Sequence, residues 1–504
     1  MASDLDILIL AAGLGTRMRS NRAKVLHKLD GRPLINHVCE TALSLDPRKV
    51  FVVVGHQGDD VRAAVMSEFD GDRFEFPLQE RQLGTGDAVN AAREMLAGSH
   101  STLMVLSGDV PMISRQTLEE LLKTHLEYKG RGAACTLLSV QLDDPSGYGR
   151  VIRDDSYEFE RIVEQKDAAV EQLMVDEINA GIYCFDTAKL FSALSRIENN
   201  NAQGEYYLTD VPGIFRSQGD DVAIYLSEEP REVEGVNDRR QLAAMESEIR
   251  RRTIDRLMVE SGVTFIDPAN AYISSRAAIG RDTVIHPNVT VEGASRVGEG
   301  CVIRSGTRIK ESVIGNHVEI RDNCVIRDSE VGSDCTLGPM AHLRGHAVMQ
   351  DGAKVGNFVE MKKSNLGPGS KASHLTYLGD ATIGRDTNIG AGTITCNYDG
   401  KNKHETHIGD NVKIGSDTML IAPITVGDRA VTGAGSVVTK DIEPDTLVAG
   451  VPAKQLKRRD DTTAAEAPEK TSAEQVVGDE ALERMNNFAD RKEQFIASIK
   501  KSES

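Results

Sequence analysis

The residues best suited to chemistry lie in a glycine-rich segment that directly follows the apolar run Ile7–Leu10. This segment reads Ala-Ala-Gly-Leu-Gly-Thr-Arg-Met over 11–18, and Lys24 follows soon after it. Glycines after a strand let backbone N–H groups approach a phosphate or a base, and Arg17 and Lys24 add two cations. The segment is neither a Walker A loop nor a dinucleotide fingerprint, because it lacks both Gly-Lys-Ser/Thr and a third glycine. A plain strand-to-helix turn is the alternative interpretation.

A carboxylate, Asp109, follows the apolar run Leu103–Leu106 in the segment Ser-Gly-Asp-Val-Pro over 107–111. Ligands of open α/β sheets bind at the carboxyl ends of parallel strands, and Mg²⁺ prefers hard oxygen ligands. Asp109 is therefore a candidate Mg²⁺ ligand. A helix N-cap is the alternative.

The C-terminal half offers a candidate general base, His374, because a histidine pKa lies near neutrality. Other polar residues gather in the same part of the sequence, namely Arg344, Glu360, Lys362, Lys363, Tyr377, Asn388, Asn397, Tyr398 and Ser416. Taken alone, a structural or exposed histidine is the alternative. No His/Cys cluster has zinc-binding spacing.

Two kinds of periodicity must position these residues, and the first covers residues 1–228. Short apolar runs such as 50–54 alternate with helical stretches such as 34–45 and 86–96. This alternation predicts a Rossmann-like α/β domain with a mostly parallel sheet. Apolar residues at helical spacing then predict one long amphipathic helix over 237–259, inside a linker of 229–262.

From about residue 265 the aliphatic residues recur every six positions, as in Ile273, Ile279, Ile285, Val291 and Val297. This period fits neither a helix nor a sandwich strand and predicts a hexapeptide solenoid, a parallel β-helix, over 263–455. Segments 349–377 and 397–404 interrupt the period, the second as a loop pushed out of a coil. Residues 456–504, rich in Thr, Ala, Glu, Pro and Ser at their start, are predicted to be a mostly disordered tail.

Composition narrows the functional classes. The 504 residues include 59 Lys and Arg against 77 Asp and Glu, a formal net charge of −18, which disfavours nucleic-acid and anionic-membrane binding. No apolar run is long enough to span a membrane and no signal peptide is evident. The 7 cysteines are scattered and form no Cys-x-x-Cys pair, so we expect free thiols in a cytoplasmic protein.

Several longer motifs carry a family resemblance. They are the glycine-rich segment with Lys24, Gln-Leu-Gly-Thr-Gly at 82–86, Gly-Tyr-Gly-Arg at 147–150, Asn-Ala-Gly at 179–181, Val-Glu-Gly-Val-Asn at 233–237, and the strings around His374 and 390–400. Over about residues 5–450 the chain resembles the bacterial bifunctional N-acetylglucosamine-1-phosphate uridylyltransferase / glucosamine-1-phosphate N-acetyltransferase family. The resemblance implies a left-handed β-helix, a homotrimer, and synthesis of UDP-N-acetylglucosamine for peptidoglycan and lipopolysaccharide.

The resemblance also implies roles in the N-terminal domain. Arg17 and Lys24 would act on the phosphates, and Asp109 with Asn237 would hold Mg²⁺. The uridine nucleotide and the sugar phosphate would be bound by Leu10, Ala11, Ala12, Gly13, Gln79, Gly84, Thr85, Ser107, Gly108, Gly149, Glu164, Asn179 and Asn237. Ser107 stands where the family often has a bulkier residue.

In the β-helix, the resemblance makes His374 the base that deprotonates the amine of glucosamine-1-phosphate for attack on acetyl-CoA. Arg344 and Lys362 would bind the sugar phosphate. Substrate would also meet Tyr377, Asn388, Asn397 and Tyr398, and the coenzyme would meet Ala391, Ser416 and Ala434. Val451 stands where some family members have an arginine that contacts the coenzyme, and Lys454 could make that contact instead. Gly345 stands where a proline is common in the family.

Two other functions compete with this interpretation. One is a single-function nucleotidyltransferase whose β-helix only oligomerises it, which the complete motif string over 356–400 argues against. The other is a non-catalytic scaffold that binds sugar nucleotides. The complete sets of charged site residues in both the N-terminal domain and the β-helix argue against it. The sequence therefore favours an enzyme that first transfers acetyl from acetyl-CoA and then transfers uridylyl from UTP.

Overall fold

The computed structural model describes residues 4–98 and 101–458. From residue 459 on, the predicted disordered tail lies outside the described residues. The described residues form two compact units, one that extends to residue 369 and includes 373–375, and one of 370–372 with 376–458.

A nine-stranded sheet forms the centre of the N-terminal domain, with the order β11-β7-β10-β6-β1-β4-β5 and with β8 and β9 attached beside β10. β1 pairs in parallel with β4 and β6, whereas β10 runs antiparallel to β6 and β7. The prediction of a mostly parallel sheet is therefore confirmed. The strands are β1 (Leu5–Leu10), β4 (Val50–Val53), β5 (Phe74–Glu75), β6 (Thr102–Ser107), β7 (Cys135–Gln141), β8 (Arg150–Arg153), β9 (Phe159–Val163), β10 (Glu177–Asp186) and β11 (Val222–Leu226).

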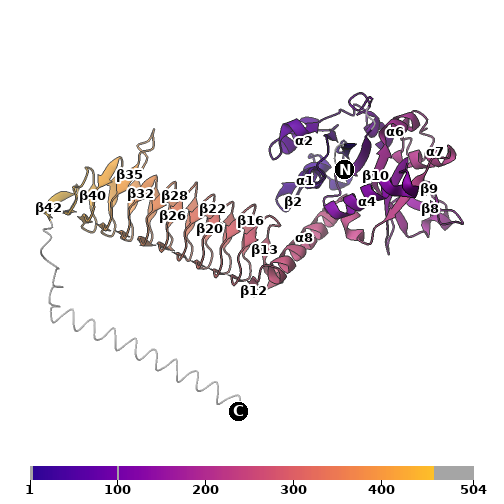
Figure 1. The fold of residues 1–504 in the computed structure, drawn as a ribbon. Helices are drawn as coiled ribbons and strands as arrows, with labels where there is room; N and C mark the ends of the chain where they lie inside the picture. Colours follow the sequence, from indigo (N-terminus) through magenta and orange to yellow (C-terminus); the bar gives the residue numbers. More distant parts are fainter. Residues whose placement is uncertain (1–3, 99–100, 459–504) are drawn as a thin grey trace, which may run out of the picture. The chain divides into compact units, whose positions relative to one another are not determined.

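Both faces of this sheet are covered, which explains the uninterrupted apolar runs of its strands. Ile7 and Ile9 of β1 pack into one buried core, and Leu8 packs into the other. The helices are α1 (Leu34–Ser44), α2 (Gly58–Met66), α3 (Thr85–Asn90), α4 (Arg115–Glu127), α5 (Val170–Leu173), α6 (Thr187–Leu194), α7 (Val211–Ser217) and α8 (Arg239–Val259). Figure 1 shows α1, α2, α4, α6 and α7 around the sheet, whereas α8 runs from this domain to β12.

One predicted helix is shorter than expected. The 86–96 stretch is helical only to Asn90, after which bonds from Ala92 N to Val89 O and from Arg93 N to Asn90 O tighten the chain into turns. Leu96 is still buried. The apolar spacing therefore predicted the burial of this stretch correctly but placed the end of the helix wrongly.

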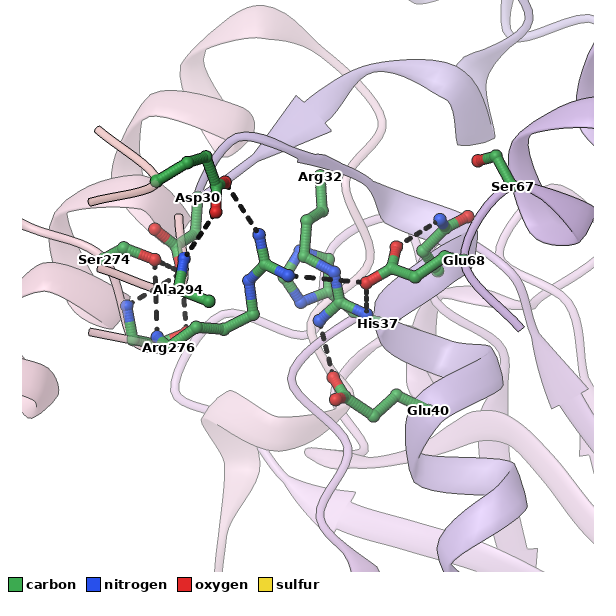
Figure 2. A network of polar contacts seen from close by, with 12 residues as sticks. Asp30, Arg32, His37, Glu40, Ser67, Glu68, Ser274, Arg276 and Ala294 are labelled. Carbon is green, nitrogen blue, oxygen red and sulfur yellow. Dashed lines mark hydrogen bonds and ion pairs between the residues drawn. The ribbon is translucent and has the colours of Figure 1, made fainter. Parts of the chain in front are cut away.

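The hairpin of β2 (Lys28–Leu29) and β3 (Arg32–Pro33) follows the glycine-rich segment 11–18, called the signature segment below. The hairpin contacts α8 through the hydrogen bond from Asp30 N to Glu246 Oε2 at 2.9 Å. Asp30 at its turn accepts hydrogen bonds from Ser274 Oγ and from Ser275 N and Oγ, at 3.1, 2.9 and 2.6 Å. Arg32 is buried and pairs with Glu40 and Glu68 at 2.6 Å each, as Figure 2 shows. The hairpin that follows Lys24 is thus fixed to the start of the β-helix.

The long amphipathic helix is confirmed as α8. Its N-cap Asp238 accepts from the backbone N–H of Arg240 and Gln241, while the Gln241 side chain accepts from the Asp238 backbone. This reciprocal capping sets the start of the helix two residues after the predicted one.

The six-residue period builds a three-sided parallel β-helix (Figure 1). Ile279 pairs with Val297, Val297 with Ile314, and Ile314 with Val331, all buried at 2–4% exposure. The predicted interruption at 349–377 is wrong in part. Short strands persist there, with Met361 and Ala372 buried in place of the usual branched residues.

In the first unit the three β-helix sheets have the following strands. One has β12 (Thr264–Phe265), β15 (Val284–Ile285), β18 (Val302–Ile303), β21 (Glu319–Ile320), β24 (Thr336–Leu337) and β27 (Lys354–Asn357). The next has β13 (Tyr272–Ile273), β16 (Thr290–Glu292), β19 (Arg308–Lys310), β22 (Val325–Arg327), β25 (His342–Arg344) and β28 (Glu360–Lys362). The third has β14 (Ala278–Ile279), β17 (Arg296–Val297), β20 (Val313–Ile314), β23 (Glu330–Val331), β26 (Val348–Met349) and β29 (Asn365–Leu366).

Residues 371–458 contribute the other short strands of the chain. They are β30 (Lys371–His374), β33 (Asn388–Ile389), β36 (Lys413–Ile414), β39 (Val431–Thr432), β41 (Thr446–Ala449) and β42 (Lys454–Arg458), then β31 (Tyr377–Gly379), β34 (Ile394–Cys396), β37 (Met419–Ile421) and β40 (Val437–Val438), then β32 (Ala381–Ile383), β35 (Thr406–Ile408) and β38 (Ile424–Val426). The predicted loop 397–404 lies between β34 and β35, which confirms it.

Two further expectations can be compared with the described residues. No helix in that part of the chain is long and apolar enough to cross a membrane. All seven cysteines are free, and six are buried.

Candidate active sites

A cavity of about 490 Å³ opens at the carboxyl ends of β1 and β6. It brings together most of the residues expected at the nucleotide, which come from the signature segment, from 79–88 and from 107–109. Its lining comprises Leu10, Ala11, Ala12, Gly13, Leu14, Gly15, Thr16, Lys24, Val25, Gln79, Gln82, Gly84, Thr85, Ala88, Ser107, Asp109 and Glu205. Arg17, Gly108, Gly149, Glu164, Asn179 and Asn237 are not among the lining residues.

The backbone at this cavity needs glycine. Gly15 has φ 62° and Gly84 has φ 116°, and a Cβ on Gly84 would stand 2.5 Å from the Tyr206 carbonyl oxygen. Gly108 N donates to Leu10 O at 3.0 Å, so Gly108 joins the ends of β6 and β1 instead of lining the cavity. Two of the motif glycines therefore shape the site sterically.

Four polar side chains far apart in the sequence converge beside this cavity. Arg17 Nη2 donates to Asn237 Oδ1 at 2.7 Å, and Lys24 Nζ donates to the same oxygen at 3.2 Å. Lys24 also forms an ion pair with Asp109, in which both side chains are less than a fifth exposed. Two cations, one carboxylate and one amide oxygen thus share one polar centre.

The donor set of this centre fits Mg²⁺. Lys24 Nζ contacts both Asp109 Oδ2 and Asn237 Oδ1, so both oxygens can reach one common cation position. Mg²⁺ usually takes one or two protein oxygens and completes its shell with water and substrate phosphates. In the described residues no group of three or more His, Cys, Asp or Glu is placed to hold a metal. The centre therefore suits a metal that arrives with phosphates.

The residues expected at the sugar lie around β8, β9 and β10. Glu164 lines a separate cavity of about 290 Å³ and accepts from Thr209 Oγ1 at 3.2 Å. Burial raises the pKa of Glu164 above its ordinary value, and nearby Asp167 and Asp210 add to that rise. A Cβ on Gly149 would stand 3.4 Å from Glu164 Oε1, so these two residues are neighbours.

Asn179 sits at a bulge of β10. Its backbone N donates to Gly149 O at 2.9 Å, its Nδ2 donates to Tyr183 Oη at 2.7 Å, and its Oδ1 accepts from Gly181 N at 3.3 Å. Bulges often re-aim groups next to active sites. The Asn179 side chain is buried and already bonded, so in this structure it shapes the sugar side through its contacts.

Sequence reasoning missed the part played by Arg150, which was noted only as a motif letter. Arg150 is 2% exposed and forms no ion pair within the described residues. Its guanidinium donates to Tyr148 O and, at 3.5 Å, to Gln165 Oε1. Gln165 Oε1 also accepts from Gly147 N. Arg150 thereby connects the two segments that carry Gly149 and Glu164. The available signal was a charged residue directly before the apolar pair Val151 and Ile152 at the start of β8.

In the β-helix, the parallel register places two expected phosphate ligands side by side. Arg344 of β25 pairs with Lys362 of β28. Neighbouring strands lie about 4.8 Å apart, so these cations form one patch. Arg344 Nε also donates to Glu360 Oε1 at 2.6 Å. Glu360 therefore orients the guanidinium that the resemblance assigned to the phosphate.

His374 is exposed on β30, and its Nδ1 lies 2.8 Å from Asn357 Oδ1. An oxygen acceptor at Nδ1 selects the tautomer with its proton there, which leaves Nε2 as the basic nitrogen. Asn357 was not expected at the site. It belongs to the motif string over 356–400, but no residue spacing in that string indicates which side chain contacts the histidine.

The second unit holds the remaining expected substrate residues. Asn397 is buried and donates to Asp380, which sequence reasoning also missed. Tyr398 is 59% exposed, and its hydroxyl donates to Gly400 O at 2.7 Å. Within the same loop, backbone N–H groups of Asn402 and Lys401 and the His404 ring lower the pKa of Asp399 to about 2. Tyr377 and Asn388 lie on β31 and β33, with Asn388 exposed.

The residues expected at the coenzyme lie on three successive corners of this unit. Asp417 N donates to Ala391 O at 2.6 Å, and Gly435 N donates to Ser416 O at 2.8 Å. Ala391, Ser416 and Ala434 therefore follow one line along the β-helix. Val451 and Lys454, where the sequence departs from the family, are both exposed at its end.

Comparisons with known proteins agree with this division of the chain. Residues 7–227 match the nucleotidyl transferase family model, 267–365 match the GMPPB C-terminal domain, and 405–440 match the bacterial transferase hexapeptide model with six repeats. Curated relatives named bifunctional protein GlmU are similar along most of the chain. That of Heliobacterium modesticaldum is 48% identical over 87% of this chain and 94% of its own length. That of Syntrophomonas wolfei is 46% identical over 88% and 96%, and that of Corynebacterium glutamicum 44% over 93% and 98%.

Proposed function

The chain belongs to the family of bifunctional GlmU proteins, and from this premise we propose how its residues divide the two reactions. It is a two-domain transferase, with a nucleotidyltransferase followed by a hexapeptide left-handed β-helix. The β-helix transfers acetyl from acetyl-CoA to glucosamine-1-phosphate. The N-terminal domain then transfers uridylyl from UTP to N-acetylglucosamine-1-phosphate and releases pyrophosphate. We place the domain limits at 1–228, 229–262 and 263–455.

The convergence of Arg17, Lys24, Asp109 and Asn237 carries the uridylyl assignment. The sugar phosphate oxygen attacks the α-phosphorus of UTP in line while pyrophosphate leaves, so the protein must orient the phosphates and balance their charge. Arg17 and Lys24 take that part. The signature backbone with Gln79, Gly84 and Thr85 holds the nucleotide, and Gly149, Glu164 and Asn179 define the sugar side.

Asp109 and Asn237 are the residues that would hold Mg²⁺, which would supply positive charge at the phosphate oxygens. In the structure Lys24 neutralises Asp109. If Mg²⁺ were held by these two oxygens, the Lys24 ammonium would be available to the phosphates, because both cations would bind the same pair of oxygens.

The His374–Asn357 contact carries the acetyl assignment. Nε2 of the selected tautomer removes a proton from the substrate amine, the amine nitrogen attacks the thioester carbonyl carbon, and the thiolate of coenzyme A leaves. Arg344 and Lys362 hold the sugar phosphate, Tyr377, Asn388, Asn397 and Tyr398 hold the sugar, and the line of Ala391, Ser416 and Ala434 receives the coenzyme.

One pair of assays tests the two-reaction function. Thiol release from acetyl-CoA with glucosamine-1-phosphate is measured beside pyrophosphate release from UTP with N-acetylglucosamine-1-phosphate and Mg²⁺. Both products are expected from the full chain. Pyrophosphate without thiol would favour the rival enzyme whose β-helix only oligomerises it, and neither product would favour a binding scaffold.

We also propose a cytoplasmic homotrimer whose subunits share each acetyl site. His374, Asn388, Ser416 and Ala434 are all exposed in the single chain, although they should enclose two substrates. A flat β-helix side is a poor container, so an adjacent subunit would close the site.

A mixing experiment tests the shared site. His374→Ala and Asn388→Ala chains, each inactive in acetylation, are co-refolded into mixed trimers. If the two residues of one site come from different subunits, mixed trimers regain part of the thiol release because some sites keep both side chains. Sedimentation measures assembly. A fully active monomer would contradict the shared site.

Arg150→Gln tests the positioning of the sugar side. Losing the buried guanidinium frees the segments of Gly149 and Glu164, so the KM for N-acetylglucosamine-1-phosphate should rise about tenfold, the order of one charge-assisted hydrogen bond. The KM for UTP and the acetylation rate should stay unchanged. Arg161→Gln on the exposed side of β9 is the matched control. Equal rises for both substrates would assign Arg150 a general structural role instead.

A further inference from the structure

A second cavity, of about 770 Å³, adjoins the signature segment and shares no lining residue with the nucleotide cavity. It lies between the segment 20–28, the start of α2 and the start of α8. Its lining comprises Ser20, Asn21, Arg22, Leu26, His27, Lys28, Pro33, Gln57, Asp60 and Arg239. A volume of this order is usual for small-molecule sites, roughly 300–1,000 Å³.

The charge of this cavity is unusual for a chain of net charge −18. Arg22, Lys28 and Arg239 line it, and Asp60 is its single carboxylate. None of the three cations forms an ion pair within the described residues, whereas half of the arginines in residues 1–228 do. Arg239 Nε only reaches Met18 O, at 3.4 Å. The cavity therefore carries three cations against one carboxylate, and none of these cations is ion-paired with Asp60.

A buried polar atom supplies an independent observation. His27 is 5% exposed, and its Nε2 has no hydrogen-bond partner within the described residues. Burial lowers the pKa of His27, and the guanidinium groups of Arg239 and Arg22 lower it further, so both cations act on this ring. Buried polar atoms without partners are rare in native proteins and call for a missing partner.

The cavity is also connected to the catalytic lysine. Gln57 Oε1 accepts from Ala23 N at 2.5 Å, and Gln57 Nε2 donates to Asn21 O at 2.9 Å. Lys24 directly follows Ala23. Gln57, the N-cap of α2, thus fixes the backbone of Asn21 and Ala23 in the cavity wall, and Lys24, the residue after Ala23, lines the nucleotide cavity.

We propose that this cavity binds the phosphate group of a phosphorylated small molecule, independently of the nucleotide site. Arg22, Lys28 and Arg239 would donate charge-assisted hydrogen bonds to phosphate oxygens. Leu26 and Pro33 give an apolar wall for the rest of the molecule. Two sources share this chemistry, the released pyrophosphate and a sugar phosphate.

Titration calorimetry on the full chain at low salt, without Mg²⁺, tests the site with inorganic pyrophosphate and with N-acetylglucosamine-1-phosphate. The Lys24→Gln chain, weakened at the nucleotide site, should still bind at least one of these probes. Adding Arg22→Gln and Lys28→Gln should weaken that binding at least tenfold, because two charge-assisted contacts to the phosphate oxygens are lost. The tighter probe identifies the source.

Arg196→Gln, which removes another exposed arginine of the same domain, is the matched control and should change nothing. If the double substitution disturbs folding, seen as a lower melting temperature, Arg239→Gln in the Lys24→Gln chain replaces it. The proposal is wrong if the Lys24→Gln chain binds neither probe, or if removing the cations leaves binding unchanged. Because the readout is binding, a chain without uridylyl activity that keeps this site would contradict only the proposed function.

Discussion

Replacing His374 with alanine should lower thiol release by roughly 10²–10⁴-fold, the usual contribution of a general base, while pyrophosphate release stays near wild type. The two activities separate because His374 lies on β30 of the β-helix and the uridylyl residues lie in the α/β domain. Steady-state assays of both products on one preparation measure the effect.

A second histidine variant tests whether the effect is specific to His374, the histidine that contacts Asn357. His286→Ala removes another β-helix histidine, one that contacts Arg304, and should leave both activities unchanged. Asn357→Ala should lower acetylation less than His374→Ala, because the ring stays in place but loses the acceptor that selects its tautomer. A folded His374→Ala chain that acetylates at a normal rate would remove the histidine from the mechanism.

Replacing Asp109 with alanine should lower Mg²⁺-dependent uridylyl transfer by at least roughly 10²-fold and spare acetylation. Mg²⁺ has few protein ligands, so the loss of one of two oxygens matters. The same change leaves Lys24 without its ion-pair partner. Pyrophosphate release measured over a Mg²⁺ titration reports both effects.

The matched control is Asp221→Ala, which removes a carboxylate paired with Lys129 and Arg131 on the surface of the same domain. It should not change pyrophosphate release at any Mg²⁺ concentration. If high Mg²⁺ restored the Asp109→Ala chain to the wild-type rate, Asp109 would be a structural residue. The backbone bond from Val236 N to Asp109 O does not depend on the side chain, so the local fold should persist.

The sequence alone determined the architecture, because burial repeats along the chain with the period of each element. Ile7–Leu10 is apolar throughout because its strand is covered on both faces, and the β-helix shows its period because each coil of 17 or 18 residues buries equivalent positions, as at Ile279, Val297 and Ile314. The signature segment was also recognisable, since its glycines and cations are close in sequence. Met361 and Ala372 occupy buried positions of the six-residue repeat where other coils have a branched aliphatic residue. The aliphatic period was therefore hard to see in that part of the sequence.

Only the tertiary structure decided which side chains meet. Lys24 contacts Asp109 and Asn237, 85 and 213 positions away, and His374 meets Asn357 through coil stacking. The tertiary structure likewise decided that β10 runs antiparallel and that Arg150 is buried. It also placed three cations, which form no ion pair within the described residues, around His27. Periodic burial is a local property that spacing records, whereas a contact between distant side chains depends on where the whole chain returns, and no short stretch of sequence contains that information.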